Sequence, residues 1–164
     1  MMQQALDQAR QAFSQGEFPV GCVIAQEDKV LVTGSRLGTV ARSDGLFDEI
    51  NHAEMVTLQR YYRLQNRPEP EKLTLYCTME PCLMCWGAIL LSSIGTVVYA
   101  YEDAMGGATA LNRDHLAPLY RQRKISVIAP VLRAESLALF KRFFQDPANR
   151  YWRDSHLARY TLSQ

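Results

Sequence analysis

The sequence predicts an α/β protein, a three-layer α/β/α sandwich with a five-stranded mixed sheet. Three observations support this fold class. The chain has 164 residues, enough for one domain with a sizeable core, and its hydrophobic fraction of 48% is ordinary for a globular protein. Two short apolar segments near the N-terminus are joined by a tight turn, which predicts a hairpin. Helical and extended segments alternate after the hairpin, which places helices on both faces of the sheet.

The individual elements follow from local periodicity. Apolar residues within 5–13 have helical spacing, and Gly16 ends that helix. The other expected elements, in chain order, are strands at 19–25, 29–36, 73–78, 95–101 and 124–129 and helices at 52–62, 81–91 and 134–144. A long loop at 37–51 interrupts them, and long loops in compact domains are often functional. We expect one domain over 1–164, in which residues 145–164 are a basic, aromatic C-terminal tail.

Composition and charge exclude several classes of protein. No apolar run is long enough to cross a membrane, and the N-terminus lacks the apolar segment of a secretory signal. We therefore expect a cytoplasmic protein whose 4 cysteines are thiols or metal ligands. The net charge is only +1, but residues 1–112 carry −5 and residues 113–164 carry +6. The basic C-terminal third either contacts phosphates or forms solvated helix faces.

Two short motifs carry the chemistry, "HAE" at 52–54 and "PCLMC" at 81–85, each at the start of an expected helix. Cys82 and Cys85 are one helical turn apart, so they can bind one zinc ion, and His52 can supply a third ligand. Three protein ligands leave the fourth tetrahedral position open, as in catalytic zinc sites, whereas a structural site would need a fourth protein ligand. Zinc lowers the pKa of a bound water from about 15.7 towards about 7. Glu54 is placed to take a proton from that water.

Each motif alone has other interpretations. A Cys-x-x-Cys pair also occurs in redox proteins and in structural zinc sites, and His-x-Glu by itself is a weak signal. The combination, with a proline before the first cysteine, is the signature of zinc-dependent nucleobase deaminases.

The chain resembles the cytidine and deoxycytidylate deaminase superfamily, in the branch of the bacterial tRNA adenosine deaminases, guanine deaminases and fungal-type cytosine deaminases. The matching stretches are "EFPVGCVIA", "NHAEMVTL", "LTLYCTMEPCLMCWGAILLSSIGTVVYA" and "AESLALFKRFF". The resemblance implies the cytidine deaminase-like fold, one zinc ion per chain on His52, Cys82 and Cys85, and Glu54 as the proton shuttle. It also implies a homodimer, with the helix after Cys85 at a subunit contact.

The resemblance further implies substrate contacts, some of them at positions that depart from the family pattern. Phe18 and Val20 would wall the pocket. Arg36 replaces an asparagine that binds the base or sugar in relatives, and it either meets a carbonyl or anionic group of the substrate or lies in solvent. Asp103 either lies at the pocket or caps its own loop. Trp152 either closes the pocket by stacking on a base, stacks on RNA, or packs on the body of the protein.

These observations predict a hydrolytic deaminase that releases ammonia from a purine or pyrimidine base or nucleoside of the guanine, cytosine or adenosine type. The acidic loop "YEDAMGG" favours a small-molecule substrate over RNA, because Glu102 and Met105 stand where the tRNA deaminases carry basic or polar residues. Adenosine-to-inosine editing of tRNA is the alternative, favoured by overall similarity and by the basic C-terminal third. A catalytically silent partner subunit would normally lack the glutamate at position 54.

Overall fold

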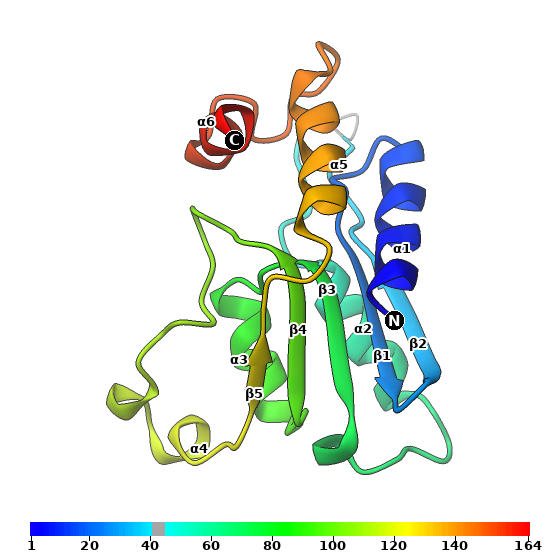
Figure 1. The fold of residues 1–164 in the computed structure, drawn as a ribbon, viewed down its shortest axis with the longest axis vertical. Helices are drawn as coiled ribbons and strands as arrows, with labels where there is room; N and C mark the ends of the chain where they lie inside the picture. Colours follow the sequence, from blue (N-terminus) through cyan, green and yellow to red (C-terminus); the bar gives the residue numbers. More distant parts are fainter. Residues whose placement is uncertain (41–44) are drawn as a thin grey trace.

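The computed structural model describes residues 1–40 and 45–164 and contains one five-stranded sheet (Figure 1). The strands are β1 (Gly21–Gln26), β2 (Lys29–Ser35), β3 (Thr74–Met79), β4 (Thr96–Tyr101) and β5 (Ser126–Ile128). Their spatial order is β2-β1-β3-β4-β5. Strand β1 is antiparallel to both β2 and β3, whereas β3, β4 and β5 are parallel. The mixed sheet predicted from the sequence is confirmed.

Helices cover both faces of this sheet (Figure 1). The longer helices are α1 (Met2–Ser14), α2 (Ala53–Tyr62), α3 (Leu83–Ser92) and α5 (Arg133–Gln145). Helices α1 and α5 pack together on one face, and α2 and α3 pack together on the other. Short helical turns lie at η1 (Pro70–Lys72), η2 (Arg113–His115) and α4 (Pro118–Arg121). The three-layer α/β/α sandwich is therefore confirmed. None of the described helices is long and apolar enough to span a membrane.

The C-terminal segment, for which we predicted a basic, aromatic tail without assigning secondary structure, contains a helix, α6 (His156–Ser163). The hydroxyl of Ser155 accepts a hydrogen bond from the backbone NH of Ala158 and caps the helix. Leu157, Ala158 and Thr161 are buried, so one face of α6 packs on the protein. The capping serine and this small apolar face were present in the sequence, but the surrounding basic and aromatic residues hid the helical period.

The two cysteines outside the zinc motif are buried core thiols. Cys22 on β1 and Cys77 on β3 are opposite each other in the sheet and completely buried. Their Sγ atoms are 3.0 Å apart. Burial raises the pKa of both thiols, which keeps them protonated and unreactive.

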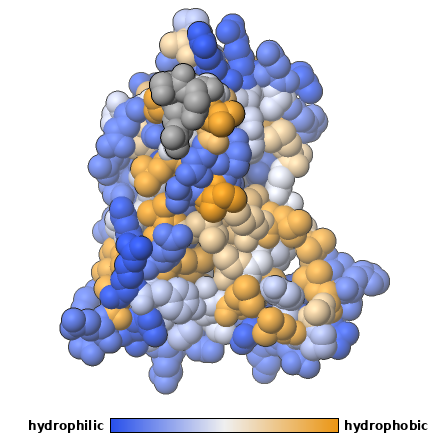
Figure 2. Space-filling view, turned by 180° about the vertical axis from the view of Figure 1, so that it is seen from behind, coloured by the Kyte–Doolittle hydropathy of each residue, from blue (hydrophilic) through white to orange (hydrophobic). Residues whose placement is uncertain are grey.

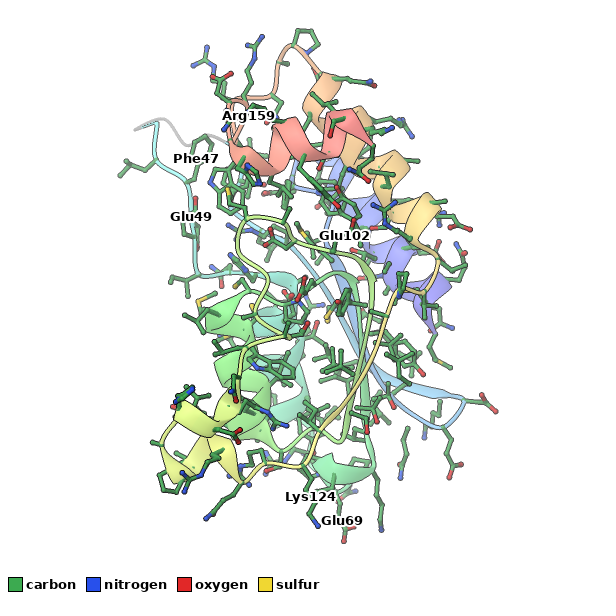
Figure 3. All side chains as sticks on the ribbon, turned by 60° about the vertical axis from the view of Figure 1, so that its left-hand side comes forward. Phe47, Glu49, Glu69, Glu102, Lys124 and Arg159 are labelled. Atoms are coloured by element: carbon green, nitrogen blue, oxygen red, sulfur yellow. The ribbon has the colours of Figure 1, made fainter. Side chains whose placement is uncertain are left out.

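Glu102 ties the end of β4 to helices α5 and α6 (Figure 3). Its carboxylate accepts hydrogen bonds from the Arg133 guanidinium, one of them at 2.8 Å, and from the Tyr160 hydroxyl at 2.7 Å. The Arg133 hydrogen bonds lower the pKa of Glu102 from 4.5 to about 2. A carboxyl with a depressed pKa stabilises the folded state above pH 4.5, and this contribution is lost as the pH falls towards about 2.

Replacing Glu102 with glutamine is therefore expected to lower the free energy of unfolding by about 1 kcal/mol at pH 7. This value is discounted for solvent screening, because the side chains of Glu102 and Arg133 are about one-third exposed. Urea unfolding of both proteins at several pH values measures the difference. The difference should shrink below pH 4.5. Glu135→Gln, at an exposed glutamate in the first turn of the same helix α5, is the control and should have a smaller effect. A Glu102→Gln effect that is constant from pH 7 to 3 would contradict the assignment of the pKa shift.

Candidate active site

The zinc motif residues lie at the N-termini of two neighbouring helices. His52 is the N-cap of α2 and Cys82 is the N-cap of α3, both with extended backbone conformations. Cys85 lies in the first turn of α3. Helix α3 begins at Leu83, two residues later than predicted, because the chain stays extended through Cys82. Because α2 and α3 pack side by side, the two helix starts bring the three side chains together.

The geometry of these three side chains fits a zinc ion. Their donor atoms all lie within 4.8 Å of one another. The Nδ1 atom of His52 is 3.6 Å from the Sγ of Cys82 and 3.5 Å from the Sγ of Cys85. Tetrahedral coordination with Zn–S near 2.3 Å and Zn–N near 2.0 Å requires N···S separations of about 3.5 Å. Two thiols and one imidazole are also the donor types that zinc prefers, so His52, Cys82 and Cys85 can hold the ion.

The two ligand thiols differ in acidity. A hydrogen bond from Cys85, reinforced by His52, lowers the pKa of Cys82 to about 4. The pKa of Cys85 is raised, first by its hydrogen bond to Cys82 and then by burial. A zinc ion bound here would take both sulfurs as thiolates and displace any proton that they share.

Glu54 lies in the first turn of α2, two residues after the ligand His52, and its side chain is only 3% exposed. Burial raises the pKa of Glu54 to about 7. A carboxyl with this pKa can both accept and release a proton near neutral pH, which is the property required of a proton shuttle.

One pocket gathers the residues that the sequence singled out. Its lining includes His52, Cys82 and Glu54 together with all five predicted substrate contacts, Phe18, Val20, Arg36, Asp103 and Trp152. Cys85 is completely buried behind the lining. The pocket also includes residues to which we assigned no role, namely Ala53, Met79, Glu80 and Gly106. The sequence feature that could have identified Glu80 as a pocket residue is its position directly before the Pro-Cys of the zinc motif.

Glu80 and Asp103 organise the loop that follows β4. The Glu80 carboxylate accepts hydrogen bonds from the backbone NH of Asp103 at 3.2 Å and from the hydroxyl of Thr109 at 2.5 Å. Asp103 itself accepts from the backbone NH groups of Met105 and Gly106, both at 2.9 Å. Asp103 therefore caps its own loop and also lines the pocket, so both interpretations of this residue describe its position.

Arg36 is not in solvent, and that alternative from the sequence is wrong. Its side chain is 2% exposed and donates to the carbonyl oxygens of Leu37, at 2.7 Å, and of Asp48. It also donates to the Glu49 carboxylate at 3.3 Å and the Tyr151 hydroxyl at 3.4 Å. The guanidinium is buried because β2 ends beneath the segment that leads to α2.

The C-terminal segment both packs on the protein and closes the pocket. Tyr151 is 1% exposed, and its ring contacts Phe47 and Phe18 at centroid distances of 5.2 and 5.4 Å. Trp152 stacks on Tyr151 at 4.8 Å and meets the edge of Phe18 at 6.0 Å. The backbone of Trp152 has φ 51°, a left-handed conformation that costs roughly 1–2 kcal/mol for a residue other than glycine. The surrounding ring contacts offset this cost.

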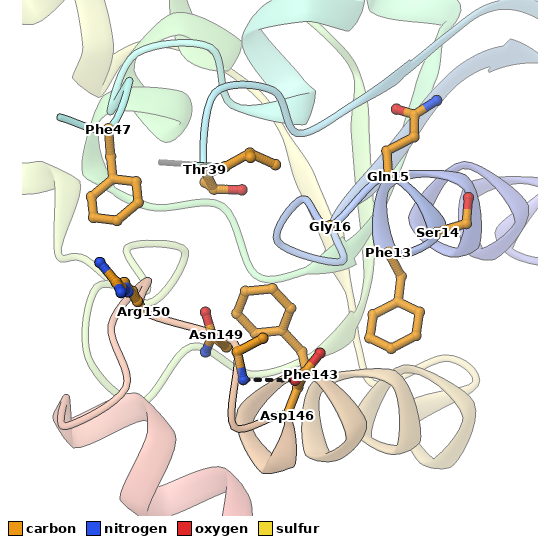
Figure 4. Close-up of a pocket in the computed structure, with 12 residues that line it drawn as sticks. Phe13, Ser14, Gln15, Gly16, Thr39, Phe47, Phe143, Asp146, Asn149 and Arg150 are labelled. Carbon is orange, nitrogen blue, oxygen red and sulfur yellow. Dashed lines mark hydrogen bonds between the residues drawn. The ribbon is translucent and has the colours of Figure 1, made fainter. Parts of the chain in front are cut away.

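A larger cavity, of about 610 Å³, lies outside the metal site (Figure 4). It is bordered by α1, the end of α5 and the residues around Asn149, and it includes Phe13, Phe143 and Arg150. None of the three zinc-binding side chains lines it, nor does Glu54. We therefore place the chemistry in the smaller pocket.

The fold and the site define the class of protein, a zinc-dependent deaminase. The family model described as "Cytidine and deoxycytidylate deaminase zinc-binding region" matches residues 1–101, and the chain belongs to this family. It is an enzyme, a hydrolase that acts on the C–N bond of a cyclic amidine.

Individual relatives agree with this family. The tRNA-specific adenosine deaminase of Streptococcus pyogenes serotype M3 is 31% identical over 157 residues, which cover 95% of this chain and 88% of the relative. A solved structure from "Biochemical and Structural Studies of A-to-I Editing by tRNA:A34 Deaminases at the Wobble Position of Transfer RNA" has a TM-score of 0.69 and 27% identity, covering 84% of this chain and 96% of that chain. A guanine deaminase from Nitrosomonas europaea, with a TM-score of 0.64, 18% identity and coverage of 87% and 81%, shares the fold.

Proposed function

We propose that this enzyme deaminates adenosine to inosine within an RNA strand of the tRNA type. The observation that carries the proposal is the similarity to enzymes named tRNA-specific adenosine deaminase along almost the whole chain. We predicted a free base or nucleoside as the first choice of substrate and tRNA as the alternative. The relatives favour the alternative.

The surface around the pocket supports an RNA substrate. Arg150 and Arg153 flank the pocket residues Tyr151 and Trp152 in the sequence, and both arginines are exposed. Arg159 on α6 is exposed as well. Exposed arginines on each side of an aromatic segment fit a single-stranded nucleic acid, in which a base stacks on an aromatic ring and phosphates contact arginine.

Proton transfer in this reaction is assigned to Glu54. Zinc, when bound, makes a water acidic enough to act as a nucleophile near neutral pH. Glu54 accepts a proton from the attacking water and passes it to the adjacent ring nitrogen as the oxygen bonds to the amino-bearing carbon. It then takes the second proton, from the hydroxyl now on that carbon, and passes it to the amino group, which leaves as ammonia when the C–N bond breaks. Water and adenosine become inosine and ammonia, and Glu54 ends the cycle in its starting state.

The remaining pocket residues would hold the base. Phe18 and Trp152 offer ring faces for stacking, and Val20 walls the apolar side. Asp103 and Arg36 supply polar groups at the rim of the same pocket, for the exocyclic and sugar groups of the substrate.

A substrate panel tests the proposal. Zinc-loaded protein is incubated with an anticodon stem-loop containing adenosine, the same stem-loop with guanosine at that position, and free adenosine, adenine, guanine, cytosine and cytidine. We expect ammonia and inosine only from the adenosine stem-loop. Its KM should also rise steeply with salt, because several phosphates are contacted. Turnover of a free base or nucleoside with an inert stem-loop would overturn the proposal.

One observation favours the second candidate, a free base or nucleoside. The pocket volume is about 70 Å³, small beside the several hundred Å³ of ordinary ligand sites, and Tyr151 and Trp152 close it. A small enclosed pocket suits a flat free base, which has no strand to accommodate. The same panel distinguishes the two candidates.

We also propose that the chain forms a homodimer through the α2–α3 face. A groove there is lined by Met55, Leu58, Tyr62, Ala88 and Leu91. Tyr62 and Leu91 are 45% and 48% exposed, so the groove presents large apolar side chains to water. Figure 2 shows apolar residues across this side of the molecule. Sedimentation should give twice the chain mass, and Leu91→Glu should give monomers; a monomeric native protein would contradict the proposal.

The cytoplasmic location stays a prediction.

A further inference from the structure

Arg36 connects two segments that are distant in the sequence. Its guanidinium donates hydrogen bonds to the Asp48 carbonyl and the Glu49 carboxylate on one side. On the other side it donates to the Tyr151 hydroxyl, which is 115 residues away in the chain. Its carbon Cζ also lies 5.8 Å from the centre of the Tyr151 ring. Figure 3 shows Glu49 and Phe47 on the segment before α2, close to the C-terminal part of the chain.

Glu49 and Tyr151 complete the connection. The Tyr151 hydroxyl donates a hydrogen bond of 2.7 Å to Oε2 of Glu49. The same oxygen accepts from Arg36. The side chain of Arg36 is 2% exposed and that of Glu49 is 47% exposed, so the group extends from the interior to the rim. A buried guanidinium without these acceptors would carry an unpaired charge, so the three side chains depend on one another. We name Arg36, Glu49 and Tyr151 the clamp.

The clamp is linked to the pocket at both of its ends. Asp48, whose carbonyl Arg36 holds, uses its own carboxylate to accept from the backbone NH groups of Ile50 and Asn51, the two residues before the zinc ligand His52. At the other end, the ring of Tyr151 stacks on the ring of its neighbour Trp152. The clamp therefore lies between a zinc ligand and the residue that closes the pocket.

We propose that Arg36 is a positioning residue that, through the clamp, holds Trp152 over the zinc pocket. With Trp152 in this place the pocket is small, about 70 Å³, so the base enters more readily when the clamp releases the C-terminal segment. Renewed clamping then returns the ring of Trp152 to the bound base. The inference rests on the proposed deamination of a nucleobase, free or in RNA, and its first test does not use the substrate.

The first test measures the exposure of Trp152. The chain has 2 tryptophans, and Trp86 is only 2% exposed, so iodide quenching of the native fluorescence reports on Trp152. Tyr151→Phe removes the hydroxyl and keeps the ring. We expect its quenching constant to rise about threefold over that of the native protein, and the added Trp152→Phe substitution to abolish the rise. Unchanged quenching in Tyr151→Phe would overturn the proposal.

Tyr160→Phe is the matched control, because Tyr160 also lies in the C-terminal segment and also donates to a glutamate, Glu102. It should leave the quenching unchanged. Arg36→Lys keeps the positive charge but cannot reach the three acceptors in one plane. It should behave like Tyr151→Phe. Equal effects of Tyr151→Phe and Tyr160→Phe would show general loosening of the segment and would overturn the proposal.

The second test uses the best substrate of the panel. Tyr151→Phe should raise KM about tenfold and change kcat less than about twofold, with the zinc content of the native protein. Tyr160→Phe should change neither constant. A fall in kcat with unchanged KM would contradict the positioning role. If Tyr151→Phe raises the quenching constant but the native enzyme does not deaminate the RNA stem-loop, the proposed RNA substrate is contradicted. The proposal for the clamp is then still supported.

Discussion

Glu54→Gln is expected to reduce kcat/KM by at least about 10³-fold while the protein keeps its zinc, since general acid–base groups contribute about 10² to 10⁴ in rate. Glutamine has nearly the same shape as glutamate and does not bind the metal, but it cannot carry a proton between water, base and leaving amine. Glu54 is only 3% exposed, so a neutral side chain should not lower the melting temperature. Metal analysis and ammonia release on the same preparation measure the two quantities.

Glu80→Gln is the control for this loss. Glu80 is a second carboxylate in the same pocket, but its oxygens are occupied by the loop residues Asp103 and Thr109. A glutamine keeps one acceptor oxygen, so we expect a loss of at most about tenfold, the effect of a displaced loop. Near-normal activity of Glu54→Gln would remove Glu54 from the reaction. Equal losses in the two variants would point to pocket distortion instead of proton transfer.

Cys82→Ala is expected to weaken zinc binding by at least about 100-fold and to abolish activity in proportion. Two donors, His52 and Cys85, would remain of the three that the structure brings together. Catalytic zinc sites normally have three protein ligands, and metal affinity is lost steeply when one is removed. Competition with a chromogenic chelator measures the affinity.

The melting temperature provides a second measurement of the same loss. Zinc that binds only the folded chain stabilises it by mass action, so the native protein should melt lower after chelation and Cys82→Ala should not respond to zinc. Cys22→Ala is the control, because Cys22 is a buried core thiol whose sulfur faces Cys77 rather than the metal site. It should lose some stability and keep its zinc. Stoichiometric zinc in purified Cys82→Ala would refute the ligand assignment.

Much of the fold could be predicted because its signals are local. The strands around Cys22 and Cys77 are short apolar runs bounded by turn residues, and helix α5 has a clear 3.6-residue period. No helix was predicted within residues 145–164, where α6 forms. An eight-residue helix is too short to be stable by itself and gains its stability from packing on the rest of the protein.

The metal site was predictable for the same reason, since its ligands lie in two short motifs. Cys82 and Cys85 are separated by one turn of one helix, so their proximity follows from helix geometry alone. The placement of His52 beside them required the packing of α2 on α3, which the resemblance to known deaminases implied and the contacts of the structure show.

The sequence by itself therefore determined the class of chemistry, since metal ligation and proton transfer depend on the types of side chain and their local spacing. Only the tertiary structure decided what surrounds that chemistry. It buried Arg36, which we had placed either on substrate or in solvent, and it joined this residue to Tyr151 from the other end of the chain. Contacts of this kind depend on where a strand ends and where a terminal segment docks. No periodicity in the sequence encodes them, because the two partners are brought together only by the packing of elements that are not neighbours in the chain.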